Sequence, residues 1–307
     1  MASFRWIIPL LLLFACGETP EPRIDLLALG HIYRWDDTND HVDPRVASLS
    51  LDTFEYVLLL GDLMGRTDEK TQNYTRLDSL FDLRSPRTLW AEGNHDRMTG
   101  NIAGHPLQPP DNQRRRLPGL EIWTLNTNLF RYPGSPPDER CAAAGAQLDS
   151  LRQWASALPV NTEYLLVLHH QNLLTNAQYA GRPLDKVWNF HHEEFDVRCA
   201  PGGRFDAVLL PLFQKIQQTG TQVVFLGGDI GQRTKTFDYH TADGLRYLGT
   251  GINNSMDPRY PPRYVTNLHP DSILVLHYFP GKKLLQTHFL PLGGESARYQ
   301  SIWDKLK

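Results

Sequence analysis

The chain has 307 residues, of which 41% are hydrophobic and 21% are charged, enough to build one large hydrophobic core. The formal net charge of -3 excludes the domain-wide basic field with which proteins replace the counterions of nucleic-acid phosphates. We therefore expect one large α/β domain that has no nucleic-acid partner.

The N-terminus is typical of an export signal. Arg5 precedes an apolar stretch at 6–15, which is about ten residues long, whereas a helix that spans a bilayer needs about 20. The tetrapeptide Leu13-Phe14-Ala15-Cys16 resembles the bacterial lipobox, whose cysteine is acylated after cleavage. The resemblance implies an exported protein of the cell envelope, anchored in the periplasm or at the outer membrane through a lipid on Cys16. Phe14 differs from the small or aliphatic residue usual there, so cleavage without lipidation stays open.

One folded domain is expected behind this signal. The residues after Cys16 are polar and include two prolines, as in a tether. The expected segments are a signal peptide at 1–16, a tether at 17–23, a folded domain at 24–292 and a C-terminal tail at 293–307.

Three apolar strands near the start of the domain each lead to polar residues. The sequence predicts them at 24–29 before His31, at 56–60 before Asp62, and at 88–90 before the tetrapeptide 93–96. Residues 71–81 carry apolar side chains at helical spacing, which predicts a crossover helix. Open α/β sheets bind ligands at the carboxyl ends of their strands, so we expect these polar residues to share one crevice.

The tetrapeptide combines three groups that suit catalysis on phosphate esters. The carbonyl of Asn94 is a neutral ligand for a hard cation, and His95 beside it can donate a proton to a leaving oxygen. Asp96 is a candidate to orient the His95 ring.

Several arginines follow these motifs. Arg66 and Arg97 are candidates to neutralise a phosphate oxygen, with simple solvation as the alternative. The segment 97–118 is rich in Pro, Gly, Gln and Arg without periodicity, which predicts a surface loop over the strand ends. Its basic run, 114–116, is interpreted either as solvated loop or as a contact for a phosphate or an anionic head group.

The rest of the domain continues the alternation of strands and helices. The predicted elements are a strand at 121–126, a helix at 147–158, a strand at 164–168, a helix at 209–216, and strands at 223–226, 245–249, 273–279 and 283–290. The strand at 164–168 leads to His169, a further candidate ligand, because metal-binding groups already follow the earlier strands.

Two cysteines remain once Cys16 is assigned to the signal. In an oxidising export compartment Cys141 and Cys199 either pair in a disulfide or stay as two free buried thiols, and the sequence leaves both open.

The pair Gly61-Asp62, followed after one helix by Gly93-Asn94-His95-Asp96, resembles the motif pattern of the calcineurin-like metallophosphoesterases. The resemblance extends from about residue 24 to about residue 290. It implies an α/β fold, the two-sheet α/β/β/α sandwich of that family. It also implies that Asp62 bridges two metal ions, that Asn94 binds the second, and that His95 assists phosphoryl transfer.

The same resemblance implies three further ligands. His31 matches a ligand of the first metal, His169 matches a ligand of the second, and Asp229 stands in for a histidine that binds the second. His31 has an alternative role, which is to hydrogen-bond the nucleophilic water.

The first metal site departs from the family. Leu29 and Gly231 replace an Asp and a His, so this site keeps two ligands unless Asp36 or Asp37 reaches in as a substitute. We therefore expect one firmly bound divalent cation and an optional second. The oxygen-rich ligands favour manganese, iron or magnesium over zinc.

The sequence thus predicts a metal-dependent phosphoesterase that hydrolyses a phosphomonoester or phosphodiester outside the cytoplasm. Its substrate would be a small molecule or an envelope component. The alternative is a degenerate, non-catalytic relative that keeps the fold to bind a ligand or partner at the cell envelope. The ligands lost at Leu29 and Gly231 favour the binding protein, whereas Asp62, Asn94 and His95 favour the enzyme.

Overall fold

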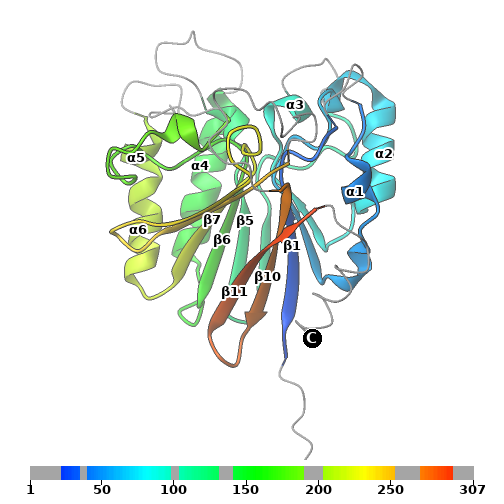
Figure 1. Cartoon of the computed structure of the whole chain (residues 1–307). Coiled ribbons are helices and arrows are strands. Elements are labelled where there is room, and N and C mark those ends of the chain that lie inside the picture. Colours follow the sequence, from blue (N-terminus) through cyan, green and yellow to red (C-terminus); the bar gives the residue numbers. More distant parts are fainter. Residues whose placement is uncertain are drawn as a thin grey trace, which may run out of the picture.

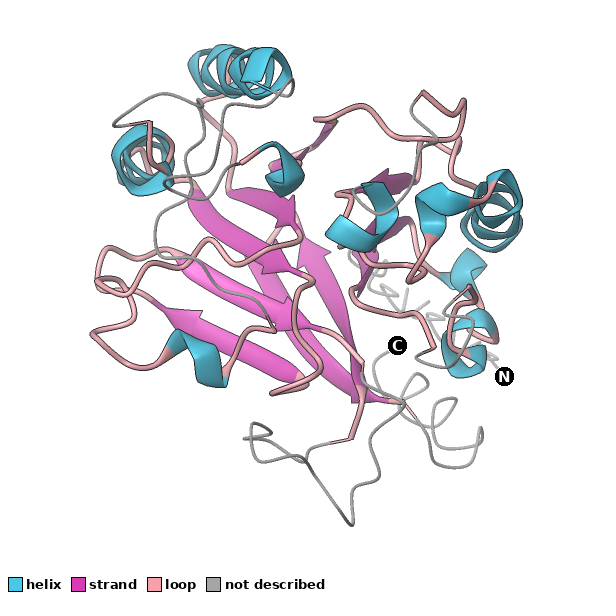
Figure 2. Cartoon of the chain, turned by 90° about the horizontal axis from the view of Figure 1, so that it is seen from above, coloured by secondary structure: helices cyan, strands magenta, loops and turns pink. Residues whose placement is uncertain are grey.

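The computed structural model describes residues 22–34, 40–97, 104–130, 141–189, 203–252 and 270–292. Two β-sheets face each other, and helices cover the outer face of each sheet (Figure 1, Figure 2). This is the α/β/β/α sandwich that the resemblance implied.

The five-stranded sheet carries the N-terminal motifs. Its order is β11-β10-β1-β2-β3, in which β1, β2 and β3 run parallel and β10 and β11 are antiparallel to their neighbours. The strands are β1 (Ile24–Leu29), β2 (Tyr56–Leu59), β3 (Thr88–Trp90), β10 (Ser272–Phe279) and β11 (Leu284–Pro291). The parallel alignment brings the carboxyl ends of β1, β2 and β3 to one edge.

The six-stranded sheet has the order β4-β5-β6-β7-β9-β8, with a parallel centre and an antiparallel strand at each edge. Its strands are β4 (Arg114–Leu117), β5 (Leu120–Thr124), β6 (Tyr164–His169), β7 (Gln222–Gly227), β8 (Thr236–His240) and β9 (Arg246–Thr250). The carboxyl ends of its four parallel strands also share one edge of the sheet.

Helices form the two outer layers. The α-helices are α1 (Pro44–Ala47) and α2 (Thr71–Phe81) on the five-stranded side, α3 (Asn94–Arg97) at the strand ends, and α4 (Cys141–Ser156), α5 (Phe205–Val208) and α6 (Leu210–Gln218) on the six-stranded side. Short 3₁₀ turns are η1 (Leu51–Thr53), η2 (Thr67–Glu69), η3 (Thr127–Leu129) and η4 (Leu184–Lys186).

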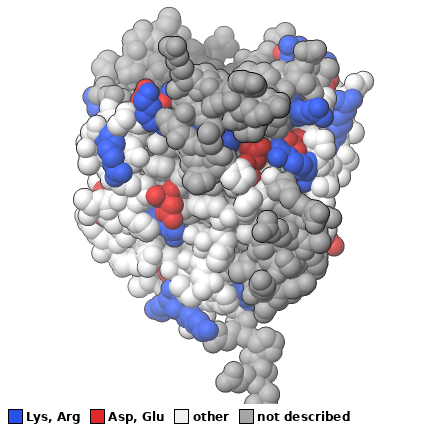
Figure 3. All heavy atoms as spheres, in the orientation of Figure 1, with Lys and Arg blue, Asp and Glu red and all other residues white. Residues whose placement is uncertain are grey.

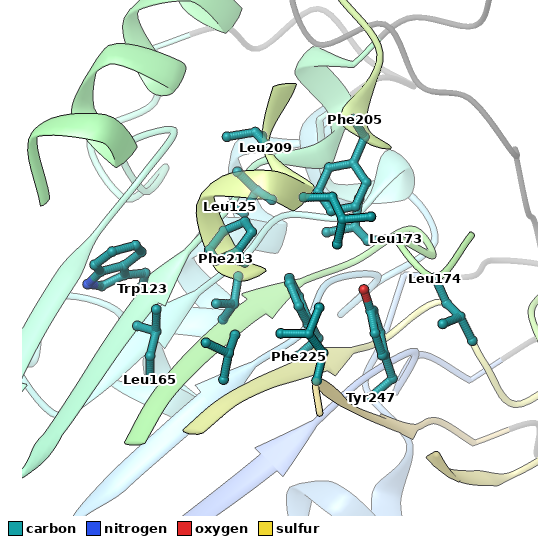
Figure 4. Close-up of a cluster of buried hydrophobic side chains, with 14 of the residues drawn as sticks. Trp123, Leu125, Leu165, Leu173, Leu174, Phe205, Leu209, Phe213, Phe225 and Tyr247 are labelled. Carbon is teal, nitrogen blue, oxygen red and sulfur yellow. The ribbon is translucent and has the colours of Figure 1, made fainter. Parts of the chain in front are cut away.

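Side chains that alternate along the strands divide the core into three layers. In β6, Leu166 faces the opposite sheet, whereas Leu165 faces the helices. Figure 4 shows part of that outer layer, where Phe213 of α6 packs against Phe225 of β7 with ring centroids 5.0 Å apart. Because both faces of the central strands are buried, their sequences are continuous apolar runs, and the predictions for these strands are confirmed to within a few residues.

Two edge strands are absent from the sequence prediction. β4 lies in the segment predicted as a surface loop, and β8 follows β7; neither contains a residue that is fully buried. Arg114 and Arg116 of β4 form ion pairs with the buried Glu121 at 2.7 and 2.5 Å. The interpretation of the basic run as a loop is therefore wrong, and Arg114 is partly buried, whereas the Arg116 side chain stays 53% exposed. Edge strands with little burial lack the apolar run on which the prediction depended.

Charged side chains of both signs are interspersed on the surface. On the face shown in Figure 3, Lys and Arg of the described residues lie beside Asp and Glu. Two of the exposed pairs are Arg246–Asp238 at 2.7 Å and Arg204–Asp206 at 2.6 Å. This arrangement agrees with the nearly balanced charge of the chain.

Several expectations fall outside the described residues. These are the signal peptide with Cys16, the candidate carboxylates Asp36 and Asp37, Cys199, and the tail at 293–307. Cys141, the first residue of α4, is disulfide-bonded, and its pairing with Cys199 stays a prediction. No helix in the described ranges is both long enough and apolar enough to cross a membrane.

The sheets approach each other closely at their carboxyl ends, and glycines allow the approach. An ideal Cβ on Gly228, just after β7, would lie 1.9 Å from Leu60 O of the facing sheet. On Gly30 it would lie 2.5 Å from Thr250 O. Backbone contact at this edge therefore requires residues without a side chain.

Gly228→Ala should destabilise the protein by about 2 kcal/mol or more, because the added methyl group forces the two sheets apart. The matched control is Gly145→Ala in α4, where an added Cβ meets nothing within 4 Å. That change should raise the free energy of unfolding by about 0.5 to 1 kcal/mol through helix propensity. Urea unfolding measures both variants, and equal stability of Gly228→Ala and the wild type would contradict the close approach.

Candidate functional site

Loops from both sheets meet at the carboxyl ends of the strands. Asp62 follows β2 and Asn94 opens α3, both from the five-stranded sheet, whereas His170 follows β6 and Asp229 follows β7. His170 Nδ1 donates a hydrogen bond across the sheets to Leu60 O at 2.8 Å. The two halves of the candidate site are therefore in direct contact.

The Asp62 carboxylate lies at the centre of the site. Its Oδ2 is 3.2 Å from His170 Nε2 and 3.8 Å from His31 Nε2, and its Oδ1 accepts from the His95 N–H at 3.0 Å. Burial raises the pKa of Asp62, but the three neighbouring histidines outweigh it and hold the pKa below its usual value. Asp62 is therefore ionised at neutral pH.

His170, and not His169, faces Asp62. Side chains alternate along β6, so His169 continues the row of Val167 toward the helices, where its ring centroid lies 5.9 Å from that of Phe225. His170, one residue further, turns to the opposite sheet. His169, the predicted ligand, does not face Asp62, and His170 takes its place as the candidate.

The two histidines differ in charge as well as direction. Burial lowers the pKa of His169 to about 3, so its ring is neutral. Burial acts in the same direction on His170, but the Asp62 carboxylate, with a smaller contribution from Asp229, raises its pKa to about 9. His170 Nε2 is buried and makes no aligned hydrogen bond to any described residue.

His31 lies beside Asp62, but the space around it offers no other ligand of a first metal among the described residues. Its Nδ1 donates to Ile252 O at 3.3 Å, and burial lowers its pKa to about 4 against the attraction of Asp62. Leu29 is fully buried in the core. An ideal Cβ on Gly231 would lie 2.7 Å from Ile252 O, so no side chain fits there without movement of the backbone.

His95 and Tyr33 complete a row of rings along the site. His95 Nδ1 donates to Gly65 O at 2.9 Å, which fixes the orientation and the tautomer of the ring. The Tyr33 ring lies between two histidines, 4.9 Å from His31 and 5.5 Å from His95. Burial and nearby carboxylates raise the pKa of Tyr33, so it is a neutral phenol. Tyr33 was not predicted from the sequence, where its only signal is its place two residues after His31.

Asp96 has a different role from the one predicted, since its oxygens do not orient the His95 ring. They accept four hydrogen bonds, from Asp62 N at 2.7 Å, Gly93 N at 2.9 Å, Leu63 N at 3.1 Å and Thr67 Oγ1 at 2.7 Å. These bonds hold Asp62 in a left-handed backbone conformation, with φ 53°, which is unfavourable for a residue other than glycine. Burial and the charge of Asp62 raise the pKa of Asp96 to about 6.

The two candidate arginines have different surroundings. Arg97 donates to Glu92 at 2.9 Å and also pairs with Asp111, so its guanidinium already has two acidic partners. Burial raises the pKa of Glu92 to about 8, although Arg97 opposes the shift. The Arg66 side chain is 47% exposed and lies 3.7 Å from Glu69. Arg66 therefore remains the better candidate to contact a phosphate.

One pair of donors among the described residues has the spacing of two ligands on one cation. Ligands about 2.1 Å from one ion and at right angles lie about 3 Å apart, which is close to the 3.2 Å that separates Asp62 Oδ2 from His170 Nε2. Asn94 and the buried Asp229 belong to the adjoining loops. Within the described ranges, however, no group of three or more His, Cys, Asp or Glu side chains is placed so that it could hold a metal ion. A second cation does not fit beside His31, because the described residues there provide too few ligand atoms.

No protein-family model and no curated protein matches the chain. Among solved structures, the chain is similar to Vps29 from Chaetomium thermophilum, at 13% sequence identity and a TM-score of 0.33, over 88% of this chain and 100% of that one. So slight a similarity carries no argument about the site.

Asp96→Asn should lower the free energy of unfolding by about 2 to 4 kcal/mol. Whichever way the new amide turns, its NH₂ faces two donors that Asp96 now satisfies, and buried unsatisfied donors are costly. Chemical denaturation measures the loss. The control is Asp149→Asn on α4, where the side chain is 79% exposed and the change should stay within about 0.5 kcal/mol. Similar effects in the two variants would contradict the role assigned to Asp96.

Proposed function

We propose that the chain is a metal-dependent phosphoesterase with a single divalent cation, bound by Asp62, Asn94, His170 and Asp229. The observation that carries the proposal is the pair of buried atoms, Asp62 Oδ2 and His170 Nε2, which lie 3.2 Å apart and come from opposite sheets. When bound, a hard cation would polarise a phosphoryl oxygen and lower the pKa of a bound water. Manganese, iron or magnesium suits the oxygen-rich ligand set better than zinc.

The remaining groups of the site suit proton transfer. With Nδ1–H donated to Gly65 O, His95 can carry a proton on Nε2 to the leaving oxygen of the ester. His31 is neutral, and its Nε2 can accept a hydrogen bond from the attacking water. Tyr33 keeps the two imidazoles apart and limits the water around them, because only 4% of its surface is exposed.

The substrate class follows from these groups. The half-exposed Arg66 offers a positive charge near the strand ends for a phosphate oxygen of a phosphomonoester or phosphodiester. The N-terminal segment supports an exported, lipid-anchored protein, so the substrate would be met outside the cytoplasm.

A second candidate is a non-catalytic binding protein on the same fold. It is favoured by the lack of a three-residue ligand group among the described residues and by the space closed at Gly231. It leaves His95 without a role, although its ring is held in one tautomer at the centre of the site.

Metal analysis and assays with aryl phosphate monoesters and diesters test the proposal. The wild type should hold about one cation per chain and hydrolyse at least one ester class. Asp62→Asn should lose both properties. His95→Asn should keep the cation and lower kcat by about 10² to 10⁴-fold, because it removes only the proton donor. The control His240→Asn, an exposed position at the end of β8, should change neither property. A metal-free and inactive wild type would favour the binding protein.

The two adjacent histidines provide a test of the ligand set. His170→Asn should abolish stoichiometric metal, because the change removes a nitrogen beside Asp62. His169→Leu should retain the cation, because this ring packs against Trp188 and Phe225 and does not face Asp62, although its Nδ1 donates to Gln171 O at 2.8 Å. Inductively coupled plasma analysis of both purified variants measures the difference. Metal lost from His169→Leu and kept by His170→Asn would reverse the assignment.

A further inference from the structure

The four proposed ligands come from two sheets, and no short stretch of chain fixes their separation. Asp62 and Asn94 belong to loops of the five-stranded sheet, whereas His170 and Asp229 belong to loops of the six-stranded sheet. A small displacement of one loop against the other would change every distance between the two halves. Contacts of other residues are needed to hold the ligand-bearing loops of the two sheets at a fixed separation.

Asn128, in η3, contacts the loop that carries Asn94. Its Nδ2 donates to Gly93 O at 2.9 Å and to Glu92 O at 3.1 Å, and the residue is 3% exposed. Two carbonyl acceptors fix the direction of the amide, so Asn128 Oδ1 must face the other way. Gly93 is covalently joined to Asn94, so this bond places the first half of the site.

Gln171 continues the connection to the second half. Its Nε2 donates to Asn128 Oδ1 at 2.9 Å, and its Oε1 accepts from the Thr127 hydroxyl. Its backbone N–H donates to Thr127 Oγ1 at 3.1 Å. Gln171 is covalently joined to His170. The chain of bonds therefore runs from the peptide before Asn94 to the peptide after His170, entirely through buried side chains.

We propose that Asn128 and Gln171 are positioning residues that set the separation of Asn94 and His170, and with it the affinity of the site for its cation. The inference rests on the proposed function. Neither side chain is offered as a ligand. Each orients a loop that bears one, in the way that outer-shell partners orient metal ligands. Because the bonds form one continuous path, loss of either amide should release both loops.

The test uses uncharged replacements of similar size, Asn128→Leu and Gln171→Met, together with the double variant. Each single variant should bind Mn²⁺ about 10 to 100-fold more weakly by titration calorimetry, as other outer-shell changes do. The double variant should be little worse than the weaker single variant, because both changes interrupt the same path. The electron paramagnetic resonance spectrum of bound Mn²⁺ should change in all three.

The matched control is Asn73→Leu in α2. Asn73 is equally buried, but its amide donates to Arg66 O within the five-stranded side and reaches no loop of the other sheet. This variant can lose stability, yet its Mn²⁺ affinity should stay within about threefold of the wild type. Equal Mn²⁺ affinity in Asn128→Leu, Gln171→Met and the wild type would overturn the proposal.

Amide hydrogen exchange on metal-free protein separates this inference from the proposed function. In Asn128→Leu, exchange should increase both at 93–97 and at 170–172, although Asn128 donates to the backbone of only the first loop. If the wild type takes up no Mn²⁺, the proposed function fails. Amide hydrogen exchange then decides by itself whether the hydrogen bonds of Asn128 and Gln171 connect the two loops. Exchange that increases only at 93–97 would then overturn the positioning role.

Discussion

A buried carboxylate at the end of β2 is the group on which the site depends. Asp62 is 2% exposed and lies in a strained backbone conformation, and a buried charge requires compensation. Asp96 holds the backbone from one side, and His170 provides the opposite charge from the other sheet. The metal-free site is therefore stabilised by its own ion pair. In the proposed metal-bound state a cation would have to displace a proton from His170, so it would compete with a contact that also joins the two sheets.

The central strands of both sheets could be predicted from the sequence because they are buried on both faces. The run at 164–168 is apolar throughout, and polar residues at the ends of such runs predicted where the site would lie. Burial on both faces also leaves the direction of each side chain undetermined by the sequence. An uninterrupted apolar run does not show which residues face the helices and which face the opposite sheet. His169 was preferred because it matches the ligand histidine of the family, and the apolar run gave no sign of which histidine faces the opposite sheet. Edge strands β4 and β8 were not predicted, because they are partly exposed and carry charged residues that are also common in loops.

The site residues divide in a similar way. Those whose role follows from their own chemistry, such as Asp62 and His95, could be identified from the motif. The role of Asp96 could not, because it depends on where the backbone N–H groups of a neighbouring loop point. Tyr33 and Arg97 show the same limitation: ring packing and competing carboxylates belong to the folded chain, and no spacing in the sequence encodes them.

The packing around Leu29 and Gly231 leaves no room for the two ligands that the resemblance led us to expect there. Gly231 has φ 128° and its missing side chain would meet the backbone of Ile252, the residue whose carbonyl accepts the His31 hydrogen bond. Leu29 faces the outer core with the side chains of α1 and α2. Restoring a histidine and an aspartate at these positions would therefore disturb the anchor of His31 and bury an additional charge. Backbone near Gly231 and core side chains around Leu29 fill the positions from which a second cation would be bound. The proposed activity would then depend on one cation and on the row formed by His31, Tyr33 and His95.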